Sequence, residues 1–138
     1  MEQVKAVVLA AGKGTRLHSA EHHQPKALRE ANGKPLLHYV LSALDFLPKE
    51  DTVIVVGYMR DQVEARFPEY PFAVQEPQQG TGHAVQCAKE YLEGFRGTVL
   101  VCCGDMPLLR RETYQALLAE HEKNDCPCTF LTGTTELD

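Results

Sequence analysis

The chain opens with an apolar strand that runs directly into a glycine-rich, positively charged loop. Residues 6–10 are all apolar, a pattern typical of a strand covered on both faces of a sheet. The loop that follows reads Ala11-Gly12-Lys13-Gly14-Thr15-Arg16. Glycines let the backbone approach a ligand closely, and successive N–H groups beside two cations attract an anion. The stretch therefore predicts a phosphate-binding loop at the end of a buried strand.

Two familiar phosphate-binding motifs do not fit this loop. A Walker A motif places its lysine after the second glycine, whereas Lys13 lies between Gly12 and Gly14. A dinucleotide fingerprint needs a third glycine at the position of Leu17. A plain glycine turn is the alternative interpretation. A Gly-Lys-Gly-Thr-Arg string directly after a buried strand favours a bound nucleotide instead.

Strands and helices alternate along the rest of the chain. The further predicted strands are residues 52–56, 72–74, 98–103 and 128–131, and the predicted helices are residues 36–47, 60–67, a segment from about 80 to 95, and 111–123. Alternation of this kind predicts right-handed βαβ units and a mainly parallel sheet. With 138 residues, the chain fits one α/β domain, a Rossmann-like three-layer sandwich.

A second informative stretch, Gln75 to Ala84, follows the third predicted strand. It contains Gly80-Thr81-Gly82 at the start of a helix, where unpaired N–H groups suit a phosphate or the carbonyl edge of a base. Gln75 offers both a donor and an acceptor, which suits the imide edge of a pyrimidine. The alternative is an ordinary helix cap on Thr81, and the stretch taken alone favours neither interpretation.

Two charged residues complete the candidate site. Asp105 directly follows the most apolar strand, where α/β folds bind ligands, and its carboxylate would suit Mg²⁺ beside a triphosphate. Taken alone, Asp105 reads more simply as a turn residue before Pro107. Lys26 follows Pro25, which presents it from a defined bend. Because the segments at Ala11, Gln75 and Gly104 all follow strands, we expect them to meet at one edge of the sheet.

Composition excludes several other classes of function. The net charge of −5 argues against a nucleic-acid polymer as a partner. The chain has no apolar run long enough for a membrane span and starts without a signal peptide, so we expect a cytoplasmic protein. Its cysteines lack the paired spacing of a zinc site and are predicted to be free thiols, mostly in the core. They are Cys87, Cys102, Cys103, Cys126 and Cys128.

Together these motifs resemble the uridylyltransferase domain of bacterial N-acetylglucosamine-1-phosphate uridyltransferases, which are sugar-phosphate nucleotidyltransferases. The resemblance covers nearly the whole chain, with the strings in the same order and at the same spacing. The matching strings are Leu9 to Arg16, Pro25-Lys26, Gln75 with Gln78, Gly80-Thr81-Gly82-His83-Ala84, and Gly104-Asp105. The Gly-Thr-Gly-His-Ala string is the motif most specific to this family, because many other nucleotidyltransferases share the first loop.

The resemblance implies a role for each matching residue. Arg16 and Lys26 would be the catalytic cations on the phosphates, Gln75 and the Gly80-Thr81 backbone would read uracil, and Asp105 would hold Mg²⁺ as the cofactor. The implied nucleotide-binding residues are Leu9, Ala10, Ala11, Gly12, Lys13, Gly14, Thr15, Gln75, Gln78, Gly80 and Thr81.

The reaction implied is transfer of UMP from UTP to a sugar 1-phosphate, with release of pyrophosphate, in the biosynthesis of UDP-N-acetylglucosamine, a cell wall precursor. The implied partners are these small molecules, and whether the chain forms a homo-oligomer is left open.

Two departures from the family pattern leave alternatives. The string Gly-Asp-Met-Pro-Leu around Met106 also occurs in nucleotidyltransferases of molybdenum-cofactor metabolism. The family continues past the position of Asp138 with its sugar-binding part, so residues 1–138 are expected to be the nucleotide-binding part of the domain. The alternatives are a cytidylyl- or molybdenum-cofactor-type nucleotidyltransferase, or a nucleotide-binding module without turnover.

Overall fold

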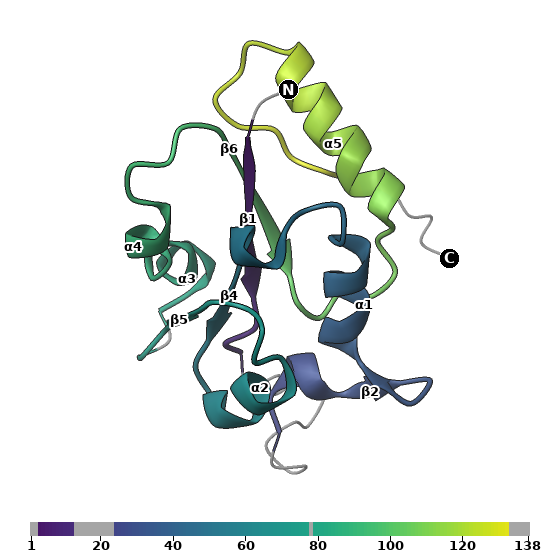
Figure 1. The fold of residues 1–138 in the computed structure, drawn as a ribbon, viewed down its shortest axis with the longest axis vertical. Helices are drawn as coiled ribbons and strands as arrows, with labels where there is room; N and C mark the ends of the chain where they lie inside the picture. The colour runs from purple at the N-terminus through teal and green to yellow at the C-terminus, as the bar shows by residue number, and fades with distance from the viewer. Residues whose placement is uncertain (1–2, 13–23, 78, 133–138) are drawn as a thin grey trace, which may run out of the picture.

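The computed structural model describes residues 3–12, 24–77 and 79–132, and its centre is a four-stranded sheet (Figure 1). Strand β1 (Val4–Leu9) lies between β4 (Thr52–Val56) and β6 (Thr98–Cys103), and β5 (Phe72–Val74) pairs with the far side of β4. Every pair in this sheet is parallel. All the strands therefore end at the same edge, as the alternating sequence pattern predicts.

Helices cover both faces of the sheet and form the outer layers of the sandwich (Figure 1). One layer consists of α1 (Leu36–Ala43), α2 (Arg60–Arg66) and α5 (Arg111–Lys123), and the other of α3 (Thr81–Gln86) and α4 (Lys89–Leu92). Successive strand residues point to opposite faces, so Ala6 and Val8 join the first layer while Val7 contacts the second. The predicted three-layer α/β fold is confirmed.

Short elements connect β1 to α1. They are the 3-10 turn η2 (Lys26–Leu28) and a small antiparallel hairpin of β2 (Glu30–Ala31) and β3 (Lys34–Pro35). Asn32 and Gly33 form the hairpin turn with φ of 54° and 81°, the left-handed backbone that asparagine and glycine tolerate best. A second 3-10 turn, η3 (Lys49–Asp51), leads into β4.

Two predicted helices are shorter in the structure than their apolar spacing indicates. The helix expected to reach Leu47 ends at Ala43 and continues as a turn in which Leu44 is still buried. The segment expected to be one helix up to about residue 95 is divided into α3 and α4. The spacing of apolar residues indicates which residues face the core, and it does not distinguish a helix from a turn that holds the same residues there.

The predicted strand at residues 128–131 is wrong. These residues form no strand, and Phe130 in this segment is 80% exposed. The segment lies beside α5, where Thr129 Oγ1 is 2.8 Å from Nδ1 of His121. A short apolar run becomes a strand only when a neighbouring strand pairs with it, and the sequence pattern carries no information about that partner.

Among the described residues, helices cover only one face of strand β6. Leu100 and Cys102 are buried against the first helix layer, whereas Val99 and Val101, on the other face, are 38% and 44% exposed. The cysteine prediction is correct in part: all five thiols are free, but only Cys102 is buried. The alternation of β6 explains the difference, because it places Cys103 on the exposed face.

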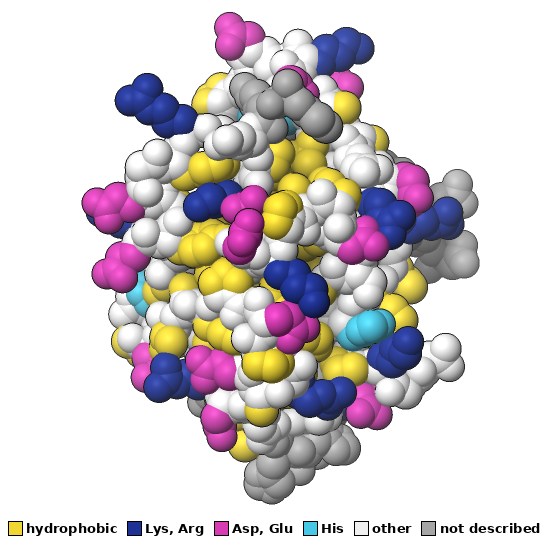
Figure 2. All heavy atoms as spheres, in the orientation of Figure 1, with side chains coloured by type: hydrophobic (Ala, Val, Ile, Leu, Met, Phe, Trp, Pro, Cys, Tyr) yellow, Lys and Arg dark blue, Asp and Glu magenta, His cyan; other side chains and the backbone are white. Residues whose placement is uncertain are grey.

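The surface carries charges of both signs. Figure 2 shows acidic and basic side chains interspersed over one face, with hydrophobic atoms between them. Within the described part of the chain, every helix is too short or too polar to cross a bilayer.

Truncating Leu37 tests the core. Leu37 on α1 is fully buried, so Leu37→Ala is expected to lower the free energy of unfolding by about 3 kcal/mol, through lost burial and an unfilled cavity. Leu108→Ala is the matched control, because Leu108 is 91% exposed and its loss is expected to change stability by less than about 0.5 kcal/mol. Urea unfolding curves measure both variants. Equal losses would contradict this placement of α1.

Candidate functional site

The segments that the sequence singled out meet at the carboxyl edge of the sheet. Gly104, after β6, donates its N–H to the carbonyl of Leu9 at 2.8 Å. Ala10 donates to Val55 at 2.8 Å, and Gln75, after β5, donates to the β4 residue Val56 at 2.7 Å. The backbone thus fixes the starts of the loops that follow β1, β5 and β6, as predicted.

Gly57 allows the closest approach within this edge. A Cβ on Gly57 would lie 2.7 Å from the carbonyl oxygen of Gln75 and 3.2 Å from Cβ of Ala11. Only glycine fits there, because the contact is with a backbone atom that is held in the sheet. Gly57 was not among the predicted site residues, although its position directly after a buried strand was the signal for it.

Only the start of the predicted phosphate loop lies within the described residues. Ala10 and Ala11 are buried and Gly12 is exposed. Lys13, Gly14, Thr15 and Arg16 lie outside the described residues, as does Gln78. Their predicted contacts with phosphate and nucleotide stay predictions.

Lys26 and Asp105 form an ion pair in which Nζ lies 2.7 Å from Oδ2. Their side chains are 32% and 28% exposed, so the pair borders on solvent. Lys26 is held by its neighbours in η2, because Ala27 and Leu28 are buried and anchor the turn. The structure therefore brings together the lysine predicted to contact phosphate and the carboxylate predicted to hold a metal.

Cys103 lies beside this ion pair. Partial burial raises the pKa of its thiol, the charge of Asp105 raises it further, and Lys26 opposes both. Burial raises the pKa of the neighbouring Cys102 to about 12, so that thiol stays protonated at neutral pH. The alternation of side chains along β6 was the sequence signal that one of the two cysteines would lie on the face of the strand opposite the core.

Gln75 is a buried polar residue at the same carboxyl edge of the sheet, after the other outer strand, β5. It is 4% exposed, and its Nε2 donates to the carbonyl of Gly80 at 3.0 Å and lies 3.1 Å from Nδ1 of His83. Nε2 of His83 is in turn 3.8 Å from Sγ of Cys87, one helical turn further along. His83 was not predicted as a site residue, although it stands inside the Gly-Thr-Gly-His-Ala string.

Gly80 precedes α3 with φ of 95° and ψ of 175°, a conformation that suits glycine. Gly80 is therefore the N-cap of α3, and Thr81 is the first helical residue. The ordinary cap on Thr81, left open as the alternative, is therefore not observed. The carbonyl of Gly80 is instead tied to Gln75.

Gln75 and the Lys26–Asp105 pair lie at the ends of the two outer strands of the sheet. Gln75 follows β5 and Asp105 follows β6, with β4 and β1 between them. Three inter-strand spacings of about 4.8 Å place these edges roughly 14 Å apart. This separation leaves room for an extended ligand to reach both groups at once.

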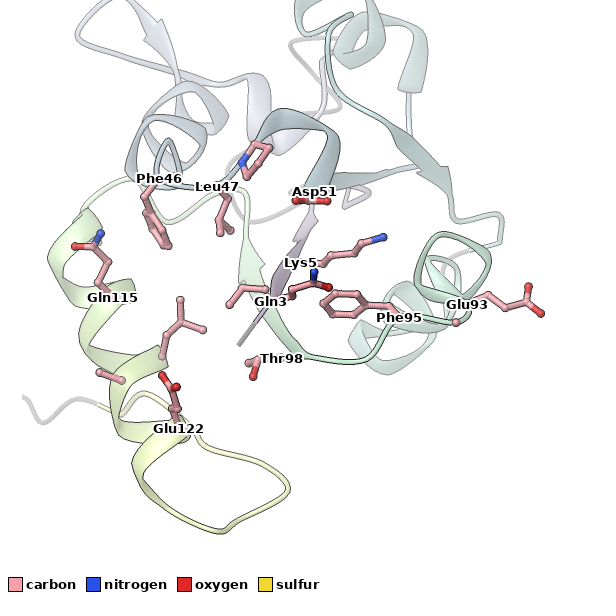
Figure 3. Close-up of a pocket in the computed structure, with 15 residues that line it drawn as sticks. Gln3, Lys5, Phe46, Leu47, Asp51, Glu93, Phe95, Thr98, Gln115 and Glu122 are labelled. Atoms are coloured by element: carbon pink, nitrogen blue, oxygen red, sulfur yellow. The ribbon is translucent and has the colours of Figure 1, made fainter. Parts of the chain in front are cut away.

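A hollow of about 730 Å³ at the opposite end of the sheet is not part of this site (Figure 3). It is lined by Gln3 and Lys5 of the β1 end, by Phe46, and by Asp51 just before β4. These residues lie at the amino ends of the strands, whereas parallel α/β sheets bind ligands at the carboxyl ends.

A family model and several curated proteins match nearly the whole chain. The family model for the MobA-like NTP transferase domain matches residues 6–136. "Bifunctional protein GlmU" of Syntrophotalea carbinolica is 46% identical over 134 residues, which are 96% of this chain and 28% of that protein. The protein of the same name from an Exiguobacterium species is 43% identical over 95% of this chain. The chain thus spans less than a third of the curated relatives it matches.

Solved structures share the fold. A nucleotidyl transferase from Methanothermobacter superposes with a TM-score of 0.64 at 24% identity, over 86% of this chain and 57% of its own. Rv0371c of Mycobacterium tuberculosis, in a complex with manganese, has a TM-score of 0.66 at 19% identity, over 85% of this chain and 58% of its own. LicC, the CTP:phosphocholine cytidylyltransferase of Streptococcus pneumoniae, has a TM-score of 0.62 at 27% identity, over 81% and 50%.

Adding a methyl group at Gly57 tests the packing of this edge. Gly57→Ala is expected to cost about 1–3 kcal/mol of stability, because the backbone oxygen of Gln75 cannot move away without breaking the sheet. In Gly82→Ala, the control, the new Cβ would meet nothing within 4 Å, and stability is expected to stay the same or rise. Thermal unfolding of both variants decides the matter. A stable Gly57→Ala variant would show that the two loops do not meet there.

Proposed function

The chain belongs to the MobA-like NTP transferase domain family, and from this membership we propose that residues 1–138 are the nucleotide-binding part of a sugar-phosphate nucleotidyltransferase. The proposed reaction transfers UMP from UTP to a sugar 1-phosphate, N-acetylglucosamine 1-phosphate, and releases pyrophosphate. Curated relatives named GlmU, 42–46% identical to this chain, support that choice of substrates. The observation that carries the proposal is the placement of Gln75 and of the Lys26–Asp105 pair at the same edge of the sheet.

The chemistry requires little of the protein beyond position and charge. An oxygen of the sugar 1-phosphate attacks the α-phosphorus of UTP, a new P–O bond forms, and the bond from the α-phosphorus to the bridging oxygen breaks. The electron pair of that bond leaves with pyrophosphate. The attacking phosphate is already ionised at neutral pH, so no general base is needed. Alignment of the two substrates and neutralisation of their charge would supply the rate enhancement.

Lys26 and Arg16 are the proposed cations of the reaction. The ammonium of Lys26 stands at the edge where the phosphates are expected, and its present partner is a carboxylate. A triphosphate carries more negative charge than Asp105, so we expect Lys26 to exchange Asp105 for the nucleotide when UTP binds. The carboxylate of Asp105 would then be available to bind a metal ion.

Asp105 fits a hard divalent cation. Mg²⁺ takes oxygen ligands and is commonly held by one or two carboxylates together with the phosphates of a substrate. No three His, Cys, Asp or Glu side chains of the described ranges are grouped closely enough to hold a metal by themselves, so the nucleotide would have to supply ligands. When bound, Mg²⁺ would offset negative charge on the phosphates. The manganese complex of Rv0371c supports a divalent cation in this fold.

Calorimetric titration with UTP, CTP, GTP and ATP in the presence of Mg²⁺ tests the nucleotide half of the proposal. We expect selective binding of UTP, because the side-chain amide of Gln75 suits the imide edge of uracil. A preference for CTP would favour a cytidylyltransferase, like LicC, and a preference for GTP would favour a molybdenum-cofactor-type enzyme. Release of pyrophosphate on addition of N-acetylglucosamine 1-phosphate then separates an enzyme from a binding module without turnover.

The ion pair predicts how a divalent cation binds without a nucleotide. Lys26→Met removes the competitor of the cation at Asp105 and is expected to raise the affinity for Mn²⁺ alone by up to about fivefold, since a pair that borders on solvent contributes up to about 1 kcal/mol. The same variant is expected to bind UTP more weakly. Electron paramagnetic resonance of free Mn²⁺ measures the first effect.

Two controls accompany this measurement. Lys34→Met removes the same charge from an exposed position on the β2–β3 hairpin and is expected to leave Mn²⁺ binding unchanged. In the double variant Lys26→Met/Asp105→Asn, the increase in affinity for Mn²⁺ is expected to disappear. If Asp105→Asn leaves the affinity for Mn²⁺ unchanged with and without nucleotide, Asp105 is not a metal ligand.

A further inference from the structure

The side-chain amide of Gln75 has a fixed orientation. Its nitrogen faces the carbonyl oxygen of Gly80 at 3.0 Å, and a carbonyl can only accept a hydrogen bond. The opposite orientation would place two acceptor oxygens against each other. The second N–H of the same amide is directed to Nδ1 of His83 at 3.1 Å. Both donors of Gln75 are therefore used inside the protein.

His83 must be in one protonation state to make this contact. To accept from Gln75, Nδ1 has to be unprotonated, so the ring hydrogen is on Nε2. Nε2 faces Sγ of Cys87 at 3.8 Å, and sulfur is a weak acceptor. The chain Gln75–His83–Cys87 is consistent with a single direction of donation, from each group to the next.

What Gln75 leaves for a ligand is its oxygen. Among residues 3–12, 24–77 and 79–132, Oε1 of Gln75 has no hydrogen-bond donor, and the residue is only 4% exposed. Oε1 is not among the fully buried unpaired atoms, so a ligand can reach it, and an unpaired acceptor favours a base with a ring N–H, such as uracil at N3. Cytosine presents an unprotonated nitrogen at the same position, and two facing acceptors would leave both groups unpaired.

We propose that His83 is a specificity-determining positioning residue: together with the carbonyl of Gly80, it holds the Gln75 amide so that its oxygen faces the base and selects a ring N–H. This inference rests on the proposed function, because it concerns the base of the nucleotide that the site would bind. His83 acts through Gln75, and the inference requires no contact between His83 and the nucleotide.

The test compares two substitutions of His83. His83→Leu removes the acceptor and is expected to lower the ratio of UTP affinity to CTP affinity by about fivefold, the value of one hydrogen bond of about 1 kcal/mol. His83→Asn carries an oxygen at the δ position and is expected to keep the ratio, because that oxygen can accept from Gln75 in place of Nδ1. Calorimetry in the presence of Mg²⁺ measures UTP, CTP and tripolyphosphate on each variant.

Tripolyphosphate separates specificity from folding. It has no base, so its affinity is expected to be equal in the wild type and in both variants. An unchanged UTP-to-CTP ratio in His83→Leu would overturn the inference. So would an equal loss for all three ligands, because that pattern indicates general damage to the site.

A spectroscopic measurement keeps the inference separate from the proposed function. The side-chain amide signals of Gln75 in a ¹⁵N-labelled sample without nucleotide are expected to shift in His83→Leu and to stay near their wild-type positions in His83→Asn. If the wild type shows no preference for UTP, the proposed function fails, and these signals still decide whether His83 holds Gln75. Unchanged signals in His83→Leu would show that it does not.

Discussion

The burial of β1 between two parallel neighbours governs where the loops of the candidate site can begin. Its backbone bonds to β4 on one side and to β6 on the other, and helices cover both of its faces. The part of β1 enclosed on both faces, Ala6–Leu9, is apolar, so at this end of the strand polar chemistry begins only in the loop that follows, at Ala10–Gly12. The loops after the neighbouring strands start beside it, because parallel strands share one carboxyl edge.

The two ends of the candidate site differ in burial, and the difference matches the chemistry proposed for each. At the β5 edge, a neutral amide is buried and its nitrogen is satisfied by Gly80 and His83. At the β6 edge, the charged pair of Lys26 and Asp105 stays close to water. Burying an ion is far more costly than burying a hydrogen-bonded amide, so the fold places its charges at the wetter edge. In the proposed complex, the neutral base would lie beside the buried amide, and the charged phosphates would lie beside the more exposed ion pair.

The ion pair also gives the unliganded protein a resting arrangement. Lys26 and Asp105 satisfy each other, and neither charge is left alone at the end of a buried strand. A pair with this exposure is weak, so a triphosphate can separate it without a large cost. A weak ion pair is therefore compatible with the proposed function, in which Lys26 binds the phosphates of the nucleotide and Asp105 binds the metal ion.

Sequence patterns alone predicted the layered architecture and the edge of the sheet where the candidate site lies. Continuous apolar runs predicted β1 and β4, helical spacing predicted α5 with its correct bounds, and the glycine-rich segments after strands predicted the edge where Ala11, Gln75 and Gly104 meet. Such features are local, because the burial of a strand or helix is recorded in its own residues. The other features became visible only in the folded structure: the missing strand at 128–131, the exposed face of β6, the pairing of Lys26 with Asp105, and the contact of His83 with Gln75. Each of these depends on which other segment lies nearby in the fold, and the periodicity of a segment carries no information about that neighbour.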